Sequence, residues 1–577
     1  MKQFLILLLC AALLLSGCGT QPIAEVTVPE TSGETTGSAA PVTFSGDIPR
    51  STGTGKDYVS RFPEETLLCL TDDGITVNGG GETQAVFTSR DIVYYADRDQ
   101  YDSGNPYGEG TEADKHTAQE ADAHTVVNIT APGAYRIQGK LSAGQIRVDL
   151  GSGAYFDPEA VVELILDNAD ITCTVAPAIV FRNVYECDGN WSVDTASSQV
   201  DTTDAGANLV LEGSNAVSGS YVAKIYKDAE GEKKLWKQDG AIYSYMSLNV
   251  FGPGSLDLTA ENEGLDTELH LTIYGGSIAI RSGNDGINTN EDGVSVTTIQ
   301  GGDLHIIAGL GEEGDGIDSN GYLVINGGSV VSAANPAADA GLDSDLGSYI
   351  HGGTVIALGS TMDWAESDSR QVTMNLQFAQ PQSSQSAIVA AAEDGTVLFA
   401  YAPVDDEVLG ENRRQYQGAV ISCPGFQLGE SCQIYLGGTV TGTETGGLYT
   451  TVTGYTGGTR MQYSGTELGM TGGMGHPGGM GQMPAPDGSR KDFTRGEAPA
   501  FPGGQTFTHG ERGQTPGSMT APEGFSGERP ELPEGETFPR REMPQEGQEA
   551  ALPEATSFTD FSFQDPVNAF SQVSPAA

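Results

Sequence analysis

The sequence is poor in basic residues. It contains 28 Lys and Arg against 78 Asp and Glu, which gives a formal charge of −50 at pH 7. Proteins that bind nucleic acid neutralise phosphates with Lys and Arg, so this balance argues against a nucleic-acid partner. An acidic polymer could bind such a chain only with a cation between the two.

Cysteine, helical periodicity and long apolar stretches are also scarce. Beyond the N-terminal leader there are five cysteines without CxxC spacing, which supports neither a zinc site nor a full disulfide framework. They are Cys69, Cys173, Cys187, Cys423 and Cys432. The last two either close one surface loop as a disulfide or are small buried residues. After the leader, no stretch is apolar enough to cross a bilayer.

The N-terminus has the pattern of a bacterial lipoprotein signal. Its apolar run at residues 4–15 is too short to span a bilayer but has the length of a signal-peptide core. Leu15-Ser16-Gly17-Cys18 follows, so we expect residues 1–18 to be the signal peptide and Cys18 to be acylated. The alternative is an ordinary signal peptide with an incidental cysteine. Acylation predicts an exported protein, held by lipid on the extracellular face of the cell membrane.

Two flanking segments lack periodic apolar residues. Residues 19–55 are rich in Thr, Ser, Gly and Pro, and we expect a disordered stalk there. Residues 466–577 are rich in Gly, Met, Pro and Glu. Such a composition buries too little apolar surface to offset the entropy of ordering. The sequence therefore predicts a disordered tail.

The middle of the chain repeats. Gly-Gly-polar turns begin at Gly275, Gly301, Gly327 and Gly352, with spacings of 26, 26 and 25 residues. A short run of alternating apolar and polar residues lies on each side of every turn, as in strands with one buried face. Strands and glycine turns at a fixed period of about 25 residues indicate an all-β solenoid.

We expect the solenoid to occupy residues 56–376. Residues 377–465 alternate without the repeat and predict a small β-rich domain that caps the last coil. In the solenoid, four apolar residues are expected to face inward in register: Leu265, Ile287, Ile317 and Leu342.

Acidic residues surround these apolar positions in the frame Gly-[Leu/Ile]-[Asp/Asn]. Residues 255–365 contain 17 acids and a single Lys or Arg, Arg281. Stacked coils would place equivalent carboxylates about 4.8 Å apart, where each pair repels by roughly 3 kcal/mol at an effective dielectric of about 20. Calcium, whose oxygen ligands lie at about 2.3–2.6 Å, would neutralise such a column. The alternative is that these Asp and Asn side chains only cap their own turns.

Several motifs together resemble a known family. They are GAYRIQGKLSAGQIRVDL, ELILDNADIT, GAIYS, LNVFGPGSLDLTA and the coils with GGS and DGI[DN], over roughly residues 126–360. The chain is similar in these motifs to the carbohydrate-binding parallel β-helix lipoproteins of clostridia. The resemblance implies a right-handed parallel β-helix that holds several calcium ions and binds cellulose-like or pectin-like polysaccharides, notably polygalacturonate. By motif, the calcium ligands would be Asp266, Asp285, Asn288, Asp315, Asp318, Asp339 and Asp343.

We therefore expect a monomer that binds an acidic plant cell-wall glycan with calcium and is not an enzyme. Sugar rings stack on aromatic side chains, for which the candidates are Tyr243, Tyr245, Tyr274 and Trp364. One alternative is a polysaccharide lyase or hydrolase on the same scaffold. A lyase needs a base, for which the regular coils offer only Arg281, and the Gly-His-Gly and Arg-x-Lys elements of polygalacturonases are missing. The other alternative is a structural or adhesive surface protein.

Overall fold

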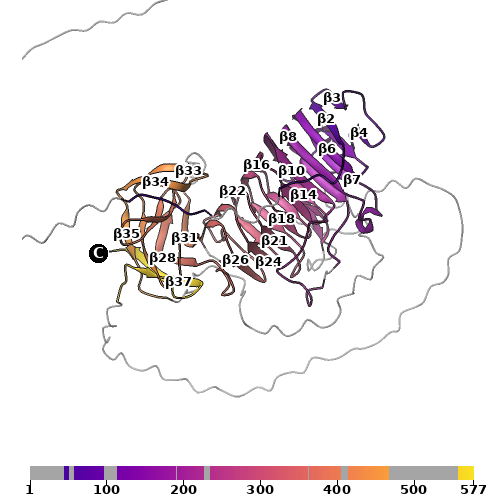
Figure 1. Ribbon diagram of the computed structural model, residues 1–577. Coiled ribbons are helices and arrows are strands. Elements are labelled where there is room, and N and C mark those ends of the chain that lie inside the picture. The colour runs from indigo at the N-terminus through magenta and orange to yellow at the C-terminus, as the bar shows by residue number, and fades with distance from the viewer. Residues whose placement is uncertain are drawn as a thin grey trace, which may run out of the picture. The chain divides into compact units, whose positions relative to one another are not determined.

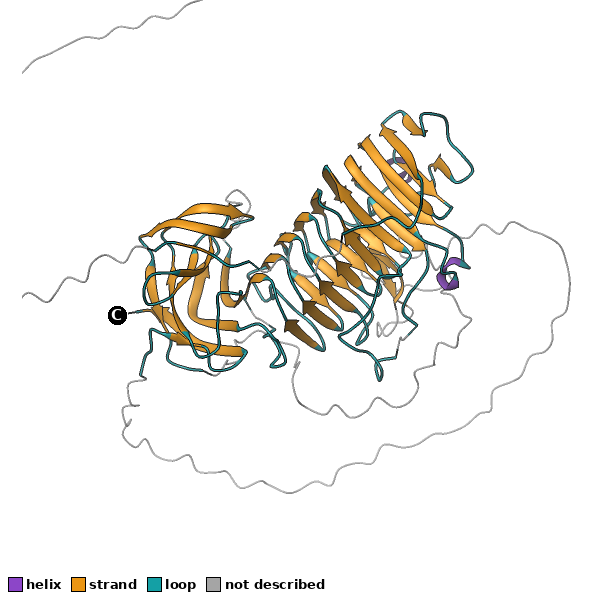
Figure 2. Ribbon diagram, viewed as in Figure 1, coloured by secondary structure: helices purple, strands orange, loops and turns teal. Residues whose placement is uncertain are grey.

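The computed structural model of the chain describes residues 44–50, 57–96, 113–189, 192–226, 234–360, 363–404, 414–466 and 556–576. Within these ranges the chain is all-β, and helix is confined to α2 (Ala118–Asp122) and a 3-10 turn at Ala154–Phe156 (Figure 2). Among the described residues, helices of the length and hydropathy needed to cross a membrane are absent. The expected signal peptide, Cys18 and most of the stalk lie outside the described residues.

Parallel ladders of short strands dominate the first part of the chain (Figure 1). The first ladder contains β5 (Thr125–Ile129), β7 (Gly144–Asp149), β9 (Ile179–Asn183), β14 (Gly240–Ser244), β17 (Glu263–Thr267), β20 (Ile287–Thr289) and β23 (Ile317–Ser319). β4 (Val86–Ser89) joins its outer edge antiparallel to β5.

Two further parallel ladders belong to one large sheet. The second ladder contains β6 (Gly133–Leu141), β8 (Val162–Cys173), β10 (Ala207–Glu212), β15 (Leu248–Phe251), β18 (Leu271–Ile273), β21 (Val296–Ile299), β24 (Tyr322–Ile325) and β26 (Gly347–Ile350). The third contains β11 (Ser214–Gly219), β16 (Ser255–Ala260), β19 (Ser277–Ser282), β22 (Asp303–Ile307), β25 (Ser329–Ala333) and β27 (Thr354–Gly359). From β15 to β23, each successive stretch of chain supplies one strand to each ladder, and we call such a stretch a coil. β2 (Glu65–Thr71) continues the second ladder beside β6 and pairs antiparallel with β3 (Gly74–Val77), while β12 (Val222–Tyr226) and β13 (Lys234–Gln238) form a separate hairpin.

The predicted inward row is confirmed on the first ladder. Leu265 pairs in register with Ile287, and Ile287 with Ile317, and all three are fully buried. Leu342 is 1% exposed and continues the row, because hydrogen bonds from Ile317 N to Gly341 O and from Asp343 N to Ile317 O lie on either side of it. Equal apolar side chains therefore stack from coil to coil and form the core.

Glycine makes the stacked turns possible. Gly302 has φ +92° and Gly328 has φ +81°, a region that disfavours side chains with a Cβ. A Cβ built on Gly328 would lie 2.5 Å from the carbonyl oxygen of Gly302 in the preceding turn. The Gly-Gly repeat therefore provides both the conformation and the space for turns to stack.

The strands after β27 are mainly antiparallel, and all but β33 contribute to a second core. They are β28 (Thr373–Ser383), β29 (Ile388–Ala391), β30 (Val397–Tyr401), β31 (Gln415–Ser422), β32 (Ser431–Leu436), β33 (Thr439–Thr445), β34 (Leu448–Thr456) and β35 (Thr459–Gln462). β31 pairs antiparallel with β27, so this sheet continues from the last coil of the third ladder. Cys423 and Cys432 are free and buried in the second core, as in the buried-residue interpretation of the sequence.

The expectation of disorder up to the C-terminus is wrong for residues 556–576. β36 (Phe561–Ser562) pairs with β32, and β37 (Val567–Pro575) pairs parallel to β28 and antiparallel to β35. Phe561 and Phe563 are fully buried in the second core. The alternation of apolar and polar residues in this short stretch was hidden by the composition of the long segment before it. Residues 467–555 lie outside the described residues.

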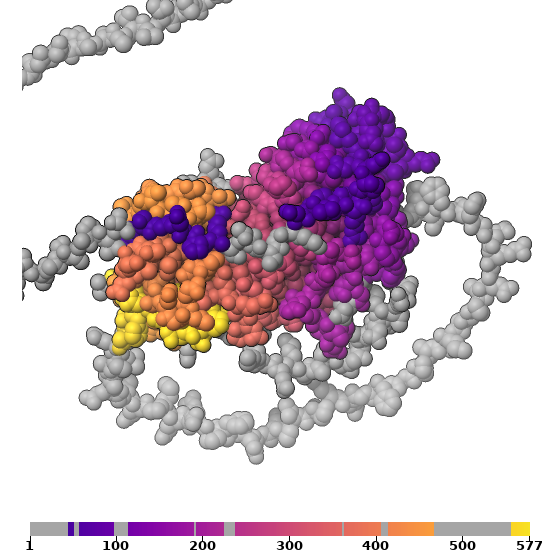
Figure 3. Space-filling view, in the orientation of Figure 1, coloured from indigo at the N-terminus to yellow at the C-terminus, as the bar shows by residue number. Residues whose placement is uncertain are grey.

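The expectation of a stalk up to residue 55 is likewise wrong for residues 45–48. β1 (Gly46–Asp47) pairs antiparallel with β34, and Ile48 is buried beside Val440 and Val452. Figure 3 shows this N-terminal stretch, in indigo, lying against the orange strands of the C-terminal part. Residues more than 400 apart thus meet in one sheet.

We expect Phe561→Ala to lower the free energy of unfolding by about 3–5 kcal/mol, because it leaves a cavity in the second core. Phe558→Ala is the matched control in the same segment, since Phe558 is 51% exposed. Chemical denaturation of the two variants would measure the difference. Equal, small losses would contradict the packing of the C-terminal strands.

Candidate metal centre

Acidic side chains form two columns beside the inward row of the first ladder. One column lies one residue after the row, where Asp266, Asn288 and Asp318 pair in register. Asp343 continues it, since its N–H donates to Ile317 O and its carbonyl accepts from Ser319 N. The sequence frame thus brings together four of the seven predicted ligands.

The second column lies two residues before the row and contains Glu263, Asp285 and Asp315. Asp285 Oδ1 accepts a hydrogen bond from Asp315 N at 2.7 Å, and Asp315 Oδ1 accepts one from Ala340 N at 2.6 Å. These carboxylates therefore cap the turn of the next coil, whereas the capping alternative expected each side chain to cap its own turn. Each capping hydrogen bond uses one carboxylate oxygen, Oδ1, and does not neutralise the negative charge of the carboxylate.

Carboxylates of the two columns approach one another at the buried end, next to Asp239. Carboxylate oxygens of Asp239, Glu263 and Asp266 lie within 4.8 Å of one another, and all three residues are buried. Glu263 Oε2 and Asn288 Oδ1 are buried without a hydrogen-bond partner. A buried unpaired polar atom is costly, and oxygens of this kind are the ligands that calcium prefers. We call the whole set the acidic column: Asp239, Glu263, Asp266, Asp285, Asn288, Asp315, Asp318 and Asp343.

A buried lysine lies at one end of the acidic column. Lys237 Nζ is 3.1 Å from Asp239 Oδ2 and 3.9 Å from Asp266 Oδ2, and it donates to Asn290 Oδ1. The count that gave Arg281 as the single Lys or Arg of residues 255–365 did not include Lys237, which reaches the column from outside that range. Arg281 instead pairs with Asp257 at 2.9 Å on the third ladder.

The electrostatics of this end reflect both burial and pairing. Burial alone would lower the pKa of Lys237, but Asp239 and Asp266 outweigh it, so its pKa lies well above the usual range. Burial raises the pKa of Asp266 well above its usual range, and Glu263 and Asp239 add to this against the lowering effect of Lys237. A single lysine thus does not compensate three neighbouring carboxylates.

Further along the column, repulsion between carboxylates adds to the effect of burial. Burial, followed by repulsion from Glu263 and Asp318, raises the pKa of Asp285 well above its usual range. Burial and then Asp343 raise the pKa of Asp318 to about 8 and that of Asp315 well above its usual range. Each of these carboxylates therefore resists ionisation unless positive charge is added.

Burial decreases along the acidic column. Asp266 is fully buried and Asp285 is 7% exposed, whereas Asp318 and Asp343 are half-buried and the nearby Asp345 is exposed. An ion at the half-buried end could keep contact with solvent or with a ligand, whereas the opposite end is enclosed.

Asp339 differs from the other predicted ligands. Its Oδ2 accepts a hydrogen bond from Gly314 N at 2.8 Å, and its charge also raises the pKa of the buried Arg414, against the stronger effect of burial. It therefore has a turn-capping role and a cation of its own nearby.

Sequence reasoning missed Asp239, Glu263 and Lys237. Glu263 could have been found, because Glu263-Gly264-Leu265-Asp266 follows the same frame as the Asp-Gly coils. Asp239 and Lys237 come from the junction of β13 and β14, which follows no repeat, and no local signal marks them.

The predicted sugar-stacking aromatics are mostly covered. Tyr243 is fully buried and its hydroxyl donates to Glu268, so the expectation that it stacks on a sugar is wrong. Tyr245 and Trp364 are half-buried against the first core. Tyr274 is half-buried and stacks on Phe251, with ring centroids 4.7 Å apart and planes at 2°.

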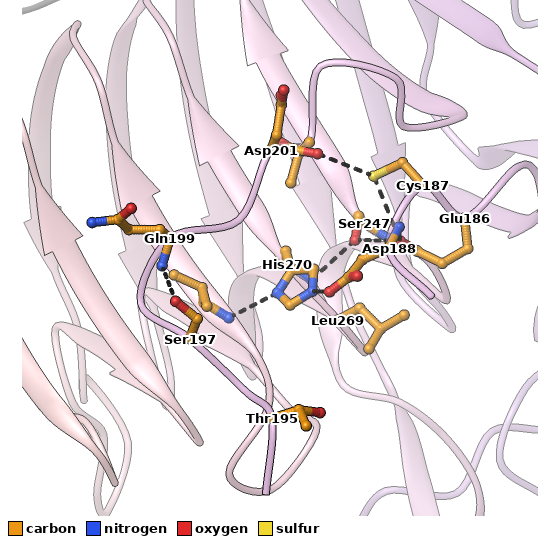
Figure 4. A network of polar contacts seen from close by, with 12 residues as sticks. Glu186, Cys187, Asp188, Thr195, Ser197, Gln199, Asp201, Ser247, Leu269 and His270 are labelled. Carbon is orange, nitrogen blue, oxygen red and sulfur yellow. Dashed lines mark hydrogen bonds and ion pairs between the residues drawn. The ribbon is translucent and has the colours of Figure 1, made fainter. Parts of the chain in front are cut away.

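A polar network lies beside the second ladder (Figure 4). Glu186 accepts hydrogen bonds from Ser247 N at 2.8 Å and Ser247 Oγ at 3.0 Å. Val296 N donates to His270 Nδ1, so Nε2 carries the proton and donates to Asp188 Oδ2 at 3.1 Å. Burial raises the pKa of the adjacent Cys187 thiol above its usual range, and Glu186 adds to this. Neither His270 nor Cys187 is therefore arranged as a base or nucleophile.

Comparison with known proteins agrees with the motifs. Residues 123–398, which include the whole acidic column, match a family described as "Carbohydrate-binding domain-containing protein". This match supports a carbohydrate-binding family. A protein of Acetivibrio thermocellus with the same description is 28% identical over 174 residues, which make up 29% of this chain and 51% of the relative. The aligned part of the chain thus spans about half the length of that curated relative.

A solved structure is also similar over part of the chain. It is the polysaccharide lyase-like protein from C. thermocellum, a gadolinium derivative, which is 19% identical. The alignment covers 52% of this chain and 98% of that one, with a TM-score of 0.30.

We expect the protein in chelator to lose stability as the pH rises from about 6.5 to about 8.5. The folded-state pKa of Asp318 is about 8, above the unfolded value of about 3.9, so its stabilising contribution is lost as the pH rises between these values. The pKa values of His124 and His351 are lowered, so these residues act in the opposite direction, below this window. Excess calcium should flatten the dependence. A thermal midpoint in chelator that rises with pH over this window would contradict it.

We expect Lys237→Met to lower the free energy of unfolding in chelator by about 3–5 kcal/mol, because it leaves buried carboxylates without their cation. Lys140→Met is the control, since Lys140 pairs with Asp170 on the surface and should matter little. Denaturant titrations of both variants would test this. A Lys237→Met protein as stable as wild type would show that the buried pair is dispensable.

Proposed function

We propose that this protein binds polysaccharide with the help of calcium held in the acidic column, and that it is not an enzyme. The observation that carries the proposal is the column itself: stacked buried carboxylates, two orphaned oxygens and one buried cation, within the range that matches a carbohydrate-binding family. Burial of this much negative charge is unfavourable without a further cation.

The residues that would hold the metal are Glu263, Asp266, Asp285, Asn288, Asp315, Asp318 and Asp343. Calcium would neutralise these carboxylates and, at the half-buried end, offer coordination positions to the carboxylate of an acidic glycan such as polygalacturonate. Without that ion, a chain with a formal charge of −50 would repel a polyuronate.

The scaffold we propose is a right-handed parallel β-helix. The three parallel ladders, the coil-by-coil order of their strands and the stacked glycine turns support it. The lipobox at Leu15–Cys18 supports a lipid-anchored protein on the extracellular face of the cell membrane. Lys237 is buried in ion pairs and Arg281 is paired with Asp257, so neither side chain is free to act as a base, which supports a protein without catalytic activity.

We expect Asp315→Asn to reduce the stabilisation by calcium and the calcium-dependent binding of oligogalacturonate. Asparagine keeps the acceptor for Ala340 N but removes a charge. In chelator the same change should be neutral or stabilising, because it relieves repulsion. Thermal melts and calorimetric titrations, each with calcium and with chelator, would measure both effects.

Asp303→Asn is the matched control, because its half-exposed carboxylate lies on the third ladder. It should leave the calcium shift unchanged. Equal calcium shifts for Asp315→Asn and wild type would exclude Asp315 as a ligand. Equal glycan binding with calcium and with chelator would overturn the calcium-dependent function.

A further inference from the structure

The segment between β9 and β10 leaves the ladders, and hydrogen bonds near each of its ends tether it to the second ladder. At its start, Glu186 accepts from Ser247, and Asp188 accepts from His270 Nε2 (Figure 4). At its end, Thr202 Oγ1 lies 2.7 Å from Asn249 Oδ1 and 2.7 Å from Thr272 Oγ1. These contacts hold the segment over the second ladder.

A polar cavity of about 400 Å³ lies beside the second tether. Ser198, Gln199, Val200 and Asp201 of the segment line one side, and Thr298, Gln300, Val324, Asn326, His351 and Arg370 line the other. Thr298 and Val324 alternate along their strands with Ile299 and Ile325, which are fully buried in the first core, so they lie on the outer face. The volume is that of an ordinary small-ligand site.

Polar side chains at equivalent positions of successive coils line this cavity. Gln300, Asn326 and His351 each directly follow the last residue of β21, β24 and β26, strands that pair in register. Their backbones stay in register too, since Asn326 N donates to Ile299 O and His351 N to Ile325 O. Two amides and an imidazole therefore recur at the coil spacing of about 4.8 Å, similar to the length of one sugar unit in an extended glycan.

These groups suit sugar hydroxyls, because the two amides can both donate and accept hydrogen bonds. His351 Nδ1 accepts from Arg370 N at 3.3 Å, so its Nε2–H is the group that can donate to a sugar. Arg370 adds a guanidinium group, which binds carboxylates in a bidentate manner. Tyr274 occupies the equivalent position one coil before Gln300, and its half-buried ring continues the row with an aromatic group.

We infer that this cavity binds a stretch of an acidic oligosaccharide, with Gln300, Asn326 and His351 contacting successive sugar units and Arg370 pairing with a uronate carboxylate. The inference rests on the proposed function and adds to it a second contact region, on a different ladder from the acidic column. The 198–201 segment forms the opposite wall and limits the site to a single extended chain.

Calorimetric titration of the full-length protein with oligogalacturonate, in calcium, tests this site. Arg370→Gln and Asn326→Ala should each weaken binding by about tenfold, as expected for a lost hydrogen bond to a charged group or a buried polar contact. Arg281→Gln is the matched control, because Arg281 pairs with Asp257 on the third ladder, and it should bind as wild type does. With methyl-esterified oligogalacturonate, the effect of Arg370→Gln should disappear while that of Asn326→Ala remains.

The outcomes separate the two proposals. If wild type binds oligogalacturonate and both cavity variants bind equally well, this site is excluded while calcium-dependent binding stands. If wild type binds neither oligogalacturonate nor a cellulose-derived oligosaccharide, the proposed function and this site both fail. Thermal melts of the variants would show that any loss of binding occurs in folded protein, as expected for the exposed Arg370.

Discussion

The structure depends on the close stacking of parallel strands, which places the same position of each coil about 4.8 Å from its equivalent in the next coil. This constraint favours apolar residues, since Leu265, Ile287 and Ile317 form a continuous core. It favours glycine at the turns, because a Cβ on Gly328 would collide with the preceding turn. For carboxylates the same distance is unfavourable, so the acidic column is a cost that the fold carries on one ladder.

That cost is balanced unevenly along the column. At the enclosed end, the positive charge belongs to the side chain of Lys237, which pairs with Asp239 and Asp266. These ion pairs do not depend on any ion from solution. Beyond it, Asp285, Asp315 and Asp318 have raised pKa values caused by burial and by one another. Removing the repulsion there requires either protons or an external cation. The calcium binding proposed above would therefore be linked to stability through these same side chains.

The periodic features could be predicted from the sequence, because a repeat places like residues together whatever else the chain does. The inward row, the stacked turns and the clustering of Asp266, Asn288 and Asp318 follow from it. Lys237 and Asp239 lie outside the repeat and reach the column through a local hairpin, so pattern alone could not assign them. The C-terminal strands were missed for another reason, since Phe561 and Phe563 belong to a short alternating stretch whose signal is lost in a long segment of different composition.

The segment over the second ladder shows how non-repeating sequence can use a repeating scaffold. His270 lies on one coil and receives a hydrogen bond from Val296 of the next, which leaves its Nε2 proton directed at Asp188. Thr202 similarly joins Asn249 and Thr272 of adjacent coils. Each tether therefore depends on two coils being in register, and the cavity wall at 198–201 is held between them. The register of the coils, which the parallel ladders fix, therefore also sets the geometry of the cavity on the second ladder.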